Sequence, residues 1–289
     1  MAEHFFDIPA SFAEREKAGA AIVSIPFEKT VSYGGGTARG PAAIFEASCQ
    51  VEYFDEVLQR EPYRAGIFSE AIPDSAEVSA LSPEAMIERF SGIVGGHLDE
   101  GRFPVVLGGE HTVTLAPFDA AVRRHPDLHV LHLDAHADLR DTYEDDPFSH
   151  ACVARRMVEK APIVQIGIRS YDKEQADALK DLPVHMLHAH EIRAGRDMAA
   201  FADEHLGETV YLTIDLDAFD PSIMPATGTP EPGGLLWNEV DALLAWLFAH
   251  RRVVAMDVVE LAPIDGLRAP DFLAARLVYR CIGRRAARK

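Results

Sequence analysis

The feature that most constrains this 289-residue chain is a regular alternation of short apolar runs with longer segments of helical character. Apolar runs of this length, rich in β-branched residues and bounded by glycine, proline or acids, predict buried strands. The expected strands are Ala20–Phe27, Phe103–Leu107, Leu128–Leu133, Pro162–Ile168, Val184–Leu187, Thr209–Asp217 and Val253–Met256. Strands that alternate with helices predict an α/β fold with a mainly parallel sheet flanked by helices. No linker or repeat divides the chain, so we expect a single three-layer domain over residues 1–289.

Three local expectations follow from capping residues and composition. Asn238 is expected to cap the apolar helix Glu239–His250. Residues 55–80 show no clear periodicity and are expected to be mostly loop. The basic segment from Arg280 to Lys289 is predicted to be a solvated helix end.

Composition argues against several classes of protein. The formal net charge of −18 argues against nucleic acid as a main partner, because proteins that bind nucleic acid carry basic surfaces that neutralise its phosphates. No apolar run approaches the ~20 residues of a membrane span, and the first residues carry no secretion signal. Three scattered cysteines, Cys49, Cys152 and Cys281, fit a reduced compartment. We therefore expect a cytoplasmic protein with no nucleic-acid or membrane partner.

Acidic and histidine side chains gather where two predicted strands end. Asp134, His136 and Asp138 alternate at i, i+2 and i+4, which places all three on one face if the backbone stays extended. Asp215 and Asp217 end another apolar run in the same way. In α/β proteins, sites are built at the carboxyl ends of the strands. Carboxylate and imidazole ligands without a thiolate suit a hard or borderline divalent ion such as Mn²⁺.

The residues alone leave two interpretations of these acids open. The simpler one is an acidic loop after a strand, with His136 packed or solvated. The other is a metal site, which the second Asp-x-Asp favours because close carboxylates repel one another unless cations hold them. A further strand ends at Gly108 and Gly109, which are expected to let the backbone turn tightly and to bring His111 to the same edge.

With these residues assembled, the sequence resembles the ureohydrolase family of arginases and agmatinases, and most closely the bacterial agmatinases. The shared motifs are Gly108-Gly109-Glu110-His111, Asp134-Ala135-His136-Ala137-Asp138, Ser149-His150, Asp215-Leu216-Asp217-Ala218-Phe219-Asp220-Pro221, Pro225-Ala226-Thr227-Gly228-Thr229-Pro230 and Asp257-Val258-Val259-Glu260-Leu261-Ala262-Pro263. Each motif is weak or moderate alone. Together they keep the family's order and span most of the chain.

The resemblance implies a binuclear centre with two Mn²⁺ ions per subunit. The implied ligands of one ion are His111, Asp134, Asp138 and Asp215, and those of the other are His136 and Asp217, with Asp134 and Asp215 bridging. Two divalent ions would cancel the charge of four carboxylates. Their field would lower the pKa of a shared, metal-bridging water and so generate a hydroxide nucleophile.

The same resemblance implies hydrolysis of a guanidinium group to urea and an amine. Asp138 would accept the hydroxide proton and pass it to the leaving amine. Glu260 would bind the guanidinium as a bidentate partner, and His150 would exchange protons with solvent. The simpler interpretations are a surface acid for Glu260 and a helix-start residue for His150.

Loop residues select the substrate. Where arginases carry an Asn that grips the α-carboxylate, this chain has Arg140, and where they carry an Asp after Gly-x-Arg, it has Ser170. Both departures resemble agmatinases, so the leading hypothesis is hydrolysis of agmatine, a small cationic guanidino substrate, to putrescine and urea. Asp172 is a candidate contact for the distal amine. Arg140 either anchors a distal carboxylate, as in 4-guanidinobutyrate, or pairs with Asp141 or Glu144.

Other functions stay open at this point. Sibling activities would act on guanidinobutyrate, arginine, a guanidino-polyamine or formiminoglutamate. The alternative without catalysis is a metal-binding, silent paralogue, and the presence of His150 and Glu260 beside a full ligand set argues against it. The family forms trimers or hexamers, so the resemblance also implies a homo-oligomer.

Overall fold

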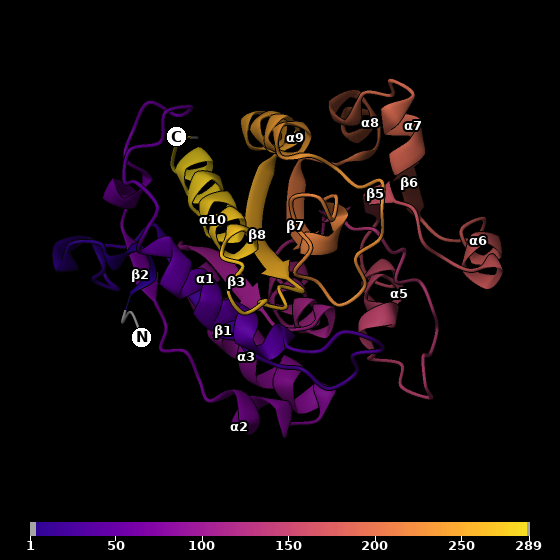
Figure 1. Ribbon diagram of the computed structural model, residues 1–289, viewed down its shortest axis with the longest axis horizontal. Coiled ribbons are helices and arrows are strands. Elements are labelled where there is room, and N and C mark those ends of the chain that lie inside the picture. Colours follow the sequence, from indigo (N-terminus) through magenta and orange to yellow (C-terminus); the bar gives the residue numbers. More distant parts are fainter. Residues whose placement is uncertain (1–3, 288–289) are drawn as a thin grey trace.

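The computed structural model describes residues 4–287 and confirms the predicted α/β architecture. Eight strands form one sheet in the order β2-β1-β3-β8-β7-β4-β5-β6, and neighbouring strands are parallel throughout (Figure 1). The strands are β1 Ala20–Ile25, β2 Ile67–Ser69, β3 Phe103–Gly108, β4 Leu128–Leu133, β5 Ile163–Ile168, β6 Val184–His188, β7 Thr209–Asp215 and β8 Arg252–Val259. The helices are α1 Gly40–Ser48, α2 Ser75–Ser79, α3 Pro83–Asp99, α4 Leu115–Val122, α5 Val153–Val158, α6 Lys173–Ala178, α7 Ala189–Arg193, α8 Met198–His205, α9 Trp237–His250 and α10 Ala269–Ala287.

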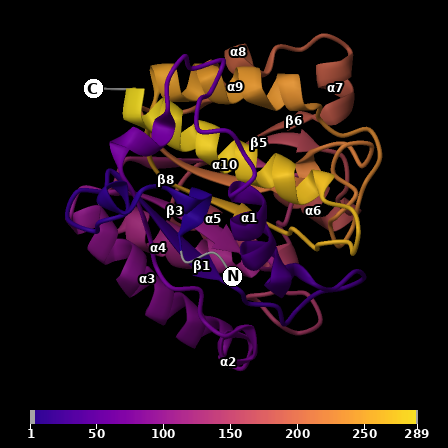
Figure 2. The ribbon, with the colours of Figure 1, turned by 60° about the vertical axis from the view of Figure 1, so that its left-hand side comes forward.

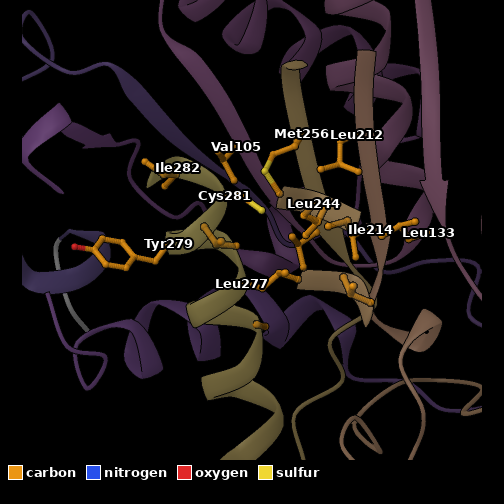
Figure 3. Close-up of a cluster of buried hydrophobic side chains, with 14 of the residues drawn as sticks. Val105, Leu133, Leu212, Ile214, Leu244, Met256, Leu277, Tyr279, Cys281 and Ile282 are labelled. Carbon is orange, nitrogen blue, oxygen red and sulfur yellow. The ribbon is translucent and has the colours of Figure 1, made fainter. Parts of the chain in front are cut away.

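Helices cover both faces of the sheet and complete the three layers. α1, α8, α9 and α10 pack on one face, and α3, α4 and α5 pack on the other (Figure 2). Between the sheet and the first helix layer, Leu244 of α9 and Leu277 of α10 share one buried cluster with Leu212 and Ile214 of β7 (Figure 3). Because a parallel sheet is buried on both faces, its strands read as nearly continuous apolar runs. No helix within residues 4–287 is long and apolar enough to cross a membrane.

The four central strands position the site. β3, β8, β7 and β4 are neighbours in the sheet although they lie far apart in the chain. Except for Asp172, which follows the next strand, β5, the predicted site residues follow the carboxyl ends of these strands. Because all strands run in the same direction, these ends meet at one edge of the sheet.

Residues 55–80 are mostly loop, as expected, and also contain the edge strand β2 and the short helix α2, which are too short to show a sequence pattern. The expected cap of α9 was wrong. Helix α9 begins at Trp237, before Asn238. The backbone amide of Leu236 donates to Glu239 Oε2 at 2.7 Å, so Glu239 caps this helix in place of Asn238.

The basic segment at the end of α10 is buried from Arg280 to Arg284 and becomes exposed at residues 286–287, so the expected solvated helix end was wrong for its first part. Arg280 and Arg284 are only 3% and 6% exposed. Arg280 pairs with Asp55 at 2.8 Å, and both arginines pair with Asp241. Spaced four residues apart, the two arginines lie on one face of the helix and turn toward other parts of the chain. Residues 288–289 lie outside the described part.

Candidate metal centre

A cavity of about 370 Å³ opens at the carboxyl edge of the four central strands. Its volume lies within the usual range of small-molecule sites. The predicted residues that line it are His111, His136, Asp138, Arg140, His150, Asp172, Asp215, Asp217 and Glu260. Asp134 is fully buried in the wall beside them. The structure thus brings the whole predicted set to one place.

His111 stands among three acids. Its Nδ1 lies 3.2 Å from Asp134 Oδ2, 3.2 Å from Asp138 Oδ2 and 3.3 Å from Asp215 Oδ2. Among the described residues this buried nitrogen has no hydrogen-bond partner. An orphaned imidazole nitrogen that faces three carboxylate oxygens suits a cation.

His136 defines a second group beside the first. Its Nδ1 lies 2.9 Å from Asp217 Oδ2 and 3.6 Å from Asp134 Oδ1. The two oxygens of Asp134 therefore face different histidines, His136 and His111. Asp134 has the geometry of a ligand shared between two adjacent cation positions.

Burial and repulsion make the charged forms of Asp215 and Asp217 unfavourable. Burial, followed by the charges of Asp217 and Asp134, raises the pKa of Asp215 well above its ordinary value. Burial and the charge of Asp134 also raise the pKa of Asp217. Burial opposes a charge on His111, yet the surrounding carboxylates raise the pKa of His111 well above its ordinary value. Divalent cations would supply the positive charge that these side chains lack.

Tight turns place these candidate ligands, and this corrects the expected extended backbone. β4 ends one residue before Asp134, and β7 ends at Asp215. Asp134 Oδ1 accepts a hydrogen bond from the His136 amide at 2.6 Å, and Asp215 Oδ1 accepts one from the Asp217 amide at 2.8 Å. Both motifs thus begin with an Asx turn. Asp138 has a φ of 51°, in the left-handed region.

The chain bends at Gly109 directly after β3, as expected, and both glycines also allow a close approach of the backbone. Neither glycine has a positive φ. A Cβ on Gly109 would lie 2.1 Å from the carbonyl oxygen of Phe27, and a Cβ on Gly108 would meet Val113 and Val259. The loop that carries His111 is therefore pressed against its neighbours with no room for a side chain.

A buried relay below His111 sets its tautomer. Thr213 Oγ1 donates to Asp257 Oδ1 at 2.7 Å, so it accepts from His111 Nε2 at 3.1 Å. Nε2 therefore carries a proton, and Nδ1 is the nitrogen left to bind an ion among the acids. Sequence reasoning gave Thr213 and Asp257 no role. The available signals were the position of Thr213 two residues before Asp215 on the same strand face, and the single acid in the apolar strand β8.

A second hydrogen-bond chain supports Asp134. Gln165 Nε2 donates to the Ala137 carbonyl at 2.7 Å and to His132 Nδ1 at 3.0 Å. His132 Nε2 therefore carries the proton and donates to Asp134 Oδ2 at 2.6 Å. His132 thus acts as a donor to a metal-facing acid rather than as a ligand.

Arg169 ties the ligand loop to its surroundings. Its guanidinium donates to the backbone carbonyls of Asp217 at 2.7 Å, Glu231 at 2.8 Å and Gly167 at 3.1 Å. Burial lowers the pKa of Arg169. Five donors in a planar fork suit this role, because several carbonyls can be held at once.

Glu260 faces the cavity from the end of β8. Its Oε1 accepts a hydrogen bond from the His111 amide at 2.6 Å. Burial, followed by repulsion from Glu110, raises the pKa of Glu260 to about 8. Its φ of 66°, like the left-handed φ of Asp138, is a strained backbone conformation of the kind that concentrates at functional sites.

Arg140 and Asp172 lie at the rim of the cavity and pair with each other at 2.5 Å. The Arg140 guanidinium also lies 5.3 Å from the centre of the Tyr143 ring. Asp172 additionally accepts the Gln175 amide at 2.8 Å and so caps α6. Two interpretations of Arg140 were open, and the structure pairs it with Asp172, an acid distant in the sequence, and not with Asp141 or Glu144.

This fold and site define a metal-dependent α/β enzyme: a parallel sheet with two adjoining His/Asp groups, suited to metal ions, at its carboxyl edge. The model of the Arginase family matches residues 18–283, and the chain belongs to this family. It is a hydrolase that acts on amidino groups. The family recognised from the motifs is confirmed.

Individual relatives and a solved structure resemble this chain over most of its length. The chain is 36% identical over 289 residues to an N(1)-aminopropylagmatine ureohydrolase of Synechocystis sp., covering 95% of this chain and 94% of the relative. It is 34% identical over 258 residues to an agmatinase of Bacillus anthracis, covering 88% and 86%. The crystal structure of the agmatine ureohydrolase of Thermoplasma volcanium superposes with a TM-score of 0.87 at 27% identity, covering 99% and 94%.

Proposed function

We propose that this chain hydrolyses the guanidinium group of agmatine to putrescine and urea, with two Mn²⁺ ions per subunit. The ion pair between Arg140 and Asp172 carries the choice of substrate. Arg140 is the one lysine or arginine among the described residues that line the cavity, and Asp172 offsets its charge. A substrate carboxylate therefore finds no unpaired arginine or lysine there. An alkylguanidine with a distal amine needs none.

The ligand types support a pair of hard or borderline divalent ions. The residues that would hold one ion are His111, Asp134, Asp138 and Asp215, and those that would hold the other are His136 and Asp217, with Asp134 and Asp215 shared. The unpartnered His111 Nδ1 fits this assignment. When bound, such ions lower the pKa of a shared water to about neutrality and so supply the nucleophile.

The remaining roles fall to three side chains at the cavity. Glu260 would bind and orient the guanidinium, since a buried carboxylate with a raised pKa gains most from a cationic partner. Asp138 would take the proton of the nucleophile and deliver it to the leaving amine. His150, which is half-buried at the cavity wall, would exchange protons with solvent.

A second candidate substrate is agmatine extended by an aminopropyl group. Four relatives with that name are 36–37% identical to this chain, whereas four named agmatinases are 31–34% identical. The extension adds one amine and three methylenes. The cavity opens beside Tyr33, which is 87% exposed, so a longer chain has room there.

Urea release by purified, Mn²⁺-loaded protein tests the proposal. Agmatine, its aminopropyl derivative, arginine and 4-guanidinobutyrate are compared at equal concentration. We expect kcat/KM for the better of the two amines to exceed that of either carboxylate by roughly a hundredfold, because a buried anion without a partner is costly. Preference for 4-guanidinobutyrate would contradict the substrate. No urea from any of them, with two metals bound, would favour the silent paralogue.

The variant Asp172→Asn sharpens the test. It removes the charge that offsets Arg140, while its Oδ1 can still cap α6. We expect kcat/KM for 4-guanidinobutyrate to rise about tenfold relative to that for agmatine, since an unpaired arginine binds carboxylates well. Arg140→Met is the matched control and should give no such gain.

The oligomeric state and the cellular location of the enzyme are further proposals. We propose a homo-oligomer, trimer or hexamer, which light scattering coupled to size exclusion would measure. We also propose a cytoplasmic location, which fractionation of cells that express the protein would measure. A monomer, or enrichment outside the cytoplasm, would contradict these two proposals.

A further inference from the structure

Thr30, in the loop after β1, is held by a single buried acid. Glu110 precedes His111 and is fully buried. Its Oε2 accepts the backbone amides of Lys29 at 2.6 Å and Thr30 at 2.7 Å, and its Oε1 accepts the Thr30 hydroxyl at 2.9 Å. Three hydrogen bonds to one carboxylate fix both the backbone and the side chain of Thr30.

The same hydroxyl meets His150 across 120 residues of sequence. Thr30 Oγ1 lies 3.1 Å from the His150 amide nitrogen and 3.2 Å from His150 Nδ1. A hydroxyl offers one donor and two acceptor positions. Its proton points to Glu110, so both lone pairs are available to the two nitrogens of His150. Nδ1 therefore carries a proton, and proton exchange falls to Nε2.

We infer that Thr30, held by Glu110, is a positioning residue that selects the Nδ1–H tautomer of His150 and orients its ring. This inference rests on the proposed amidinohydrolase reaction, in which His150 exchanges protons with solvent. His150 takes up a proton at Nε2 and releases it from the same atom, while the Nδ1–H bond to Thr30 Oγ1 stays intact. Charge and atoms balance at one nitrogen, and Thr30 itself exchanges nothing.

Two other neighbours of His150 are weaker candidates for this role. The Ser149 hydroxyl lies 3.4 Å from the same Nδ1, at the outer limit of a hydrogen bond. The Tyr143 ring lies edge-on at 6.0 Å between ring centres and offers the imidazole no hydrogen bond. The shorter contact and the anchored hydroxyl favour Thr30.

A double-mutant cycle on the Mn²⁺-loaded enzyme tests the inference. Thr30→Val should lower kcat for agmatine roughly tenfold, with KM changed less than twofold, since it removes support from a residue that moves protons. Thr30→Ser should restore most of the loss. In a His150→Ala background, Thr30→Val should cost no further activity, because its effect passes through His150. Free imidazole should stimulate both Thr30→Val and His150→Ala.

Thr209→Val is the matched control. Like Thr30, Thr209 donates to an acid, Asp127, and accepts from a nitrogen donor, Arg252. It is fully buried, whereas Thr30 is half-buried, and it lies at the opposite end of the sheet. Its loss should leave kcat unchanged. Ser149→Ala should likewise leave kcat within about twofold, as expected for the weaker contact.

A readout independent of activity separates this inference from the proposed function. Long-range ¹H–¹⁵N spectra of metal-free, ¹⁵N-histidine protein should show the His150 ring protonated at Nδ1, with the signals identified by their absence in His150→Ala. Thr30→Val should shift this tautomer toward Nε2–H. Unchanged spectra and unchanged kcat, or an equal loss of kcat in the His150→Ala background, would overturn the inference. If no substrate releases urea, the proposed function fails while the spectra still decide the role of Thr30.

Discussion

The carboxyl edge of the sheet and the inner face of α10 both bury charged side chains, and they compensate them differently. At the edge, the ion-pair partners of the four aspartates are histidines alone, and no lysine or arginine within residues 4–287 pairs with them. At α10, Arg280 is held by Asp55, Asp241 and Glu56. We call the sheet edge the incomplete region, because its carboxylates have no lysine or arginine partner among the described residues. We call the α10 contact the complete region, because acids of the same chain neutralise its arginine.

The pKa shifts express the same contrast. Burial opposes the charge of Arg280, yet the hydrogen bonds that it donates to its acids raise the pKa of Arg280 and so favour the charged form. Burial and like charges raise the pKa of Asp215, which disfavours its charged form. Desolvation acts on both residues, and only the partners differ. A buried charge with partners of opposite sign is compatible with the fold by itself, whereas a buried cluster of like charges needs bound cations to neutralise it.

The largest expected effect comes from removing one acid of the incomplete region. Asp217→Asn keeps the acceptor for the Ala135 amide but removes a metal-facing charge. Urea release should fall by about a thousandfold or more, as for loss of a group on which the nucleophile depends. Without metal, the melting temperature should stay level or rise, because repulsion is relieved. Undiminished urea release would refute the two-ion assignment, and a lower melting temperature without metal would refute the contrast.

A change in the complete region should do the opposite. Arg280→Met leaves Asp55, which is 2% exposed, without its partner and should lower the free energy of unfolding by about 3–5 kcal/mol. Metal content and kcat of the folded protein should not change. Urea denaturation measures the first and urea-release kinetics the second. The control Arg89→Met breaks the exposed pair with Glu77 and should cost at most about 1 kcal/mol.

An intermediate effect is expected from Thr213, which links the candidate ligand His111 to the buried acid Asp257. Thr213→Val should weaken Mn²⁺ binding by about 10–100-fold, since support of a metal-bound histidine is worth that much. Thr213→Ser should bind nearly as well as the natural protein. Titration calorimetry measures both, and equal affinities for all three proteins would show that the relay does not orient His111.

The smallest effect is expected from pH acting on a second complete network. His97 is buried, accepts from Arg102 Nε at 3.0 Å and contacts Glu70 at 3.1 Å. Burial, then the charge of Arg15, lowers the pKa of His97 from its usual 6.5. The unfolded chain therefore binds the proton more readily, and stability should fall as pH drops below about 6.5, by at most about 1.4 kcal/mol per pH unit. His97→Gln should have the shallower slope in pH-dependent melting, and identical slopes would contradict this.

Much of the fold could be predicted because its signal is local. A strand buried on both faces, such as β5, reads as a continuous apolar run whatever lies beside it. The position of β5 in the sheet could not be predicted from its apolar run, because the run carries no information about neighbouring strands. β2 escaped prediction because three residues are too few to show a pattern, and the start of α9 was misplaced because Glu239 reaches back to Leu236.

The sequence by itself determined the strand-and-helix alternation, the parallel sheet and the identity of the side chains at its carboxyl edge, because period and motif lie within short stretches. Only the tertiary structure decided which charges are paired. Arg140 meets Asp172, Arg280 meets Asp55, and Thr30 meets His150, over separations that no local pattern records. Such contacts depend on the order of strands and on how helices pack. The same arginine can therefore be solvated or buried, and the same acid paired or left for a metal, until the chain has folded.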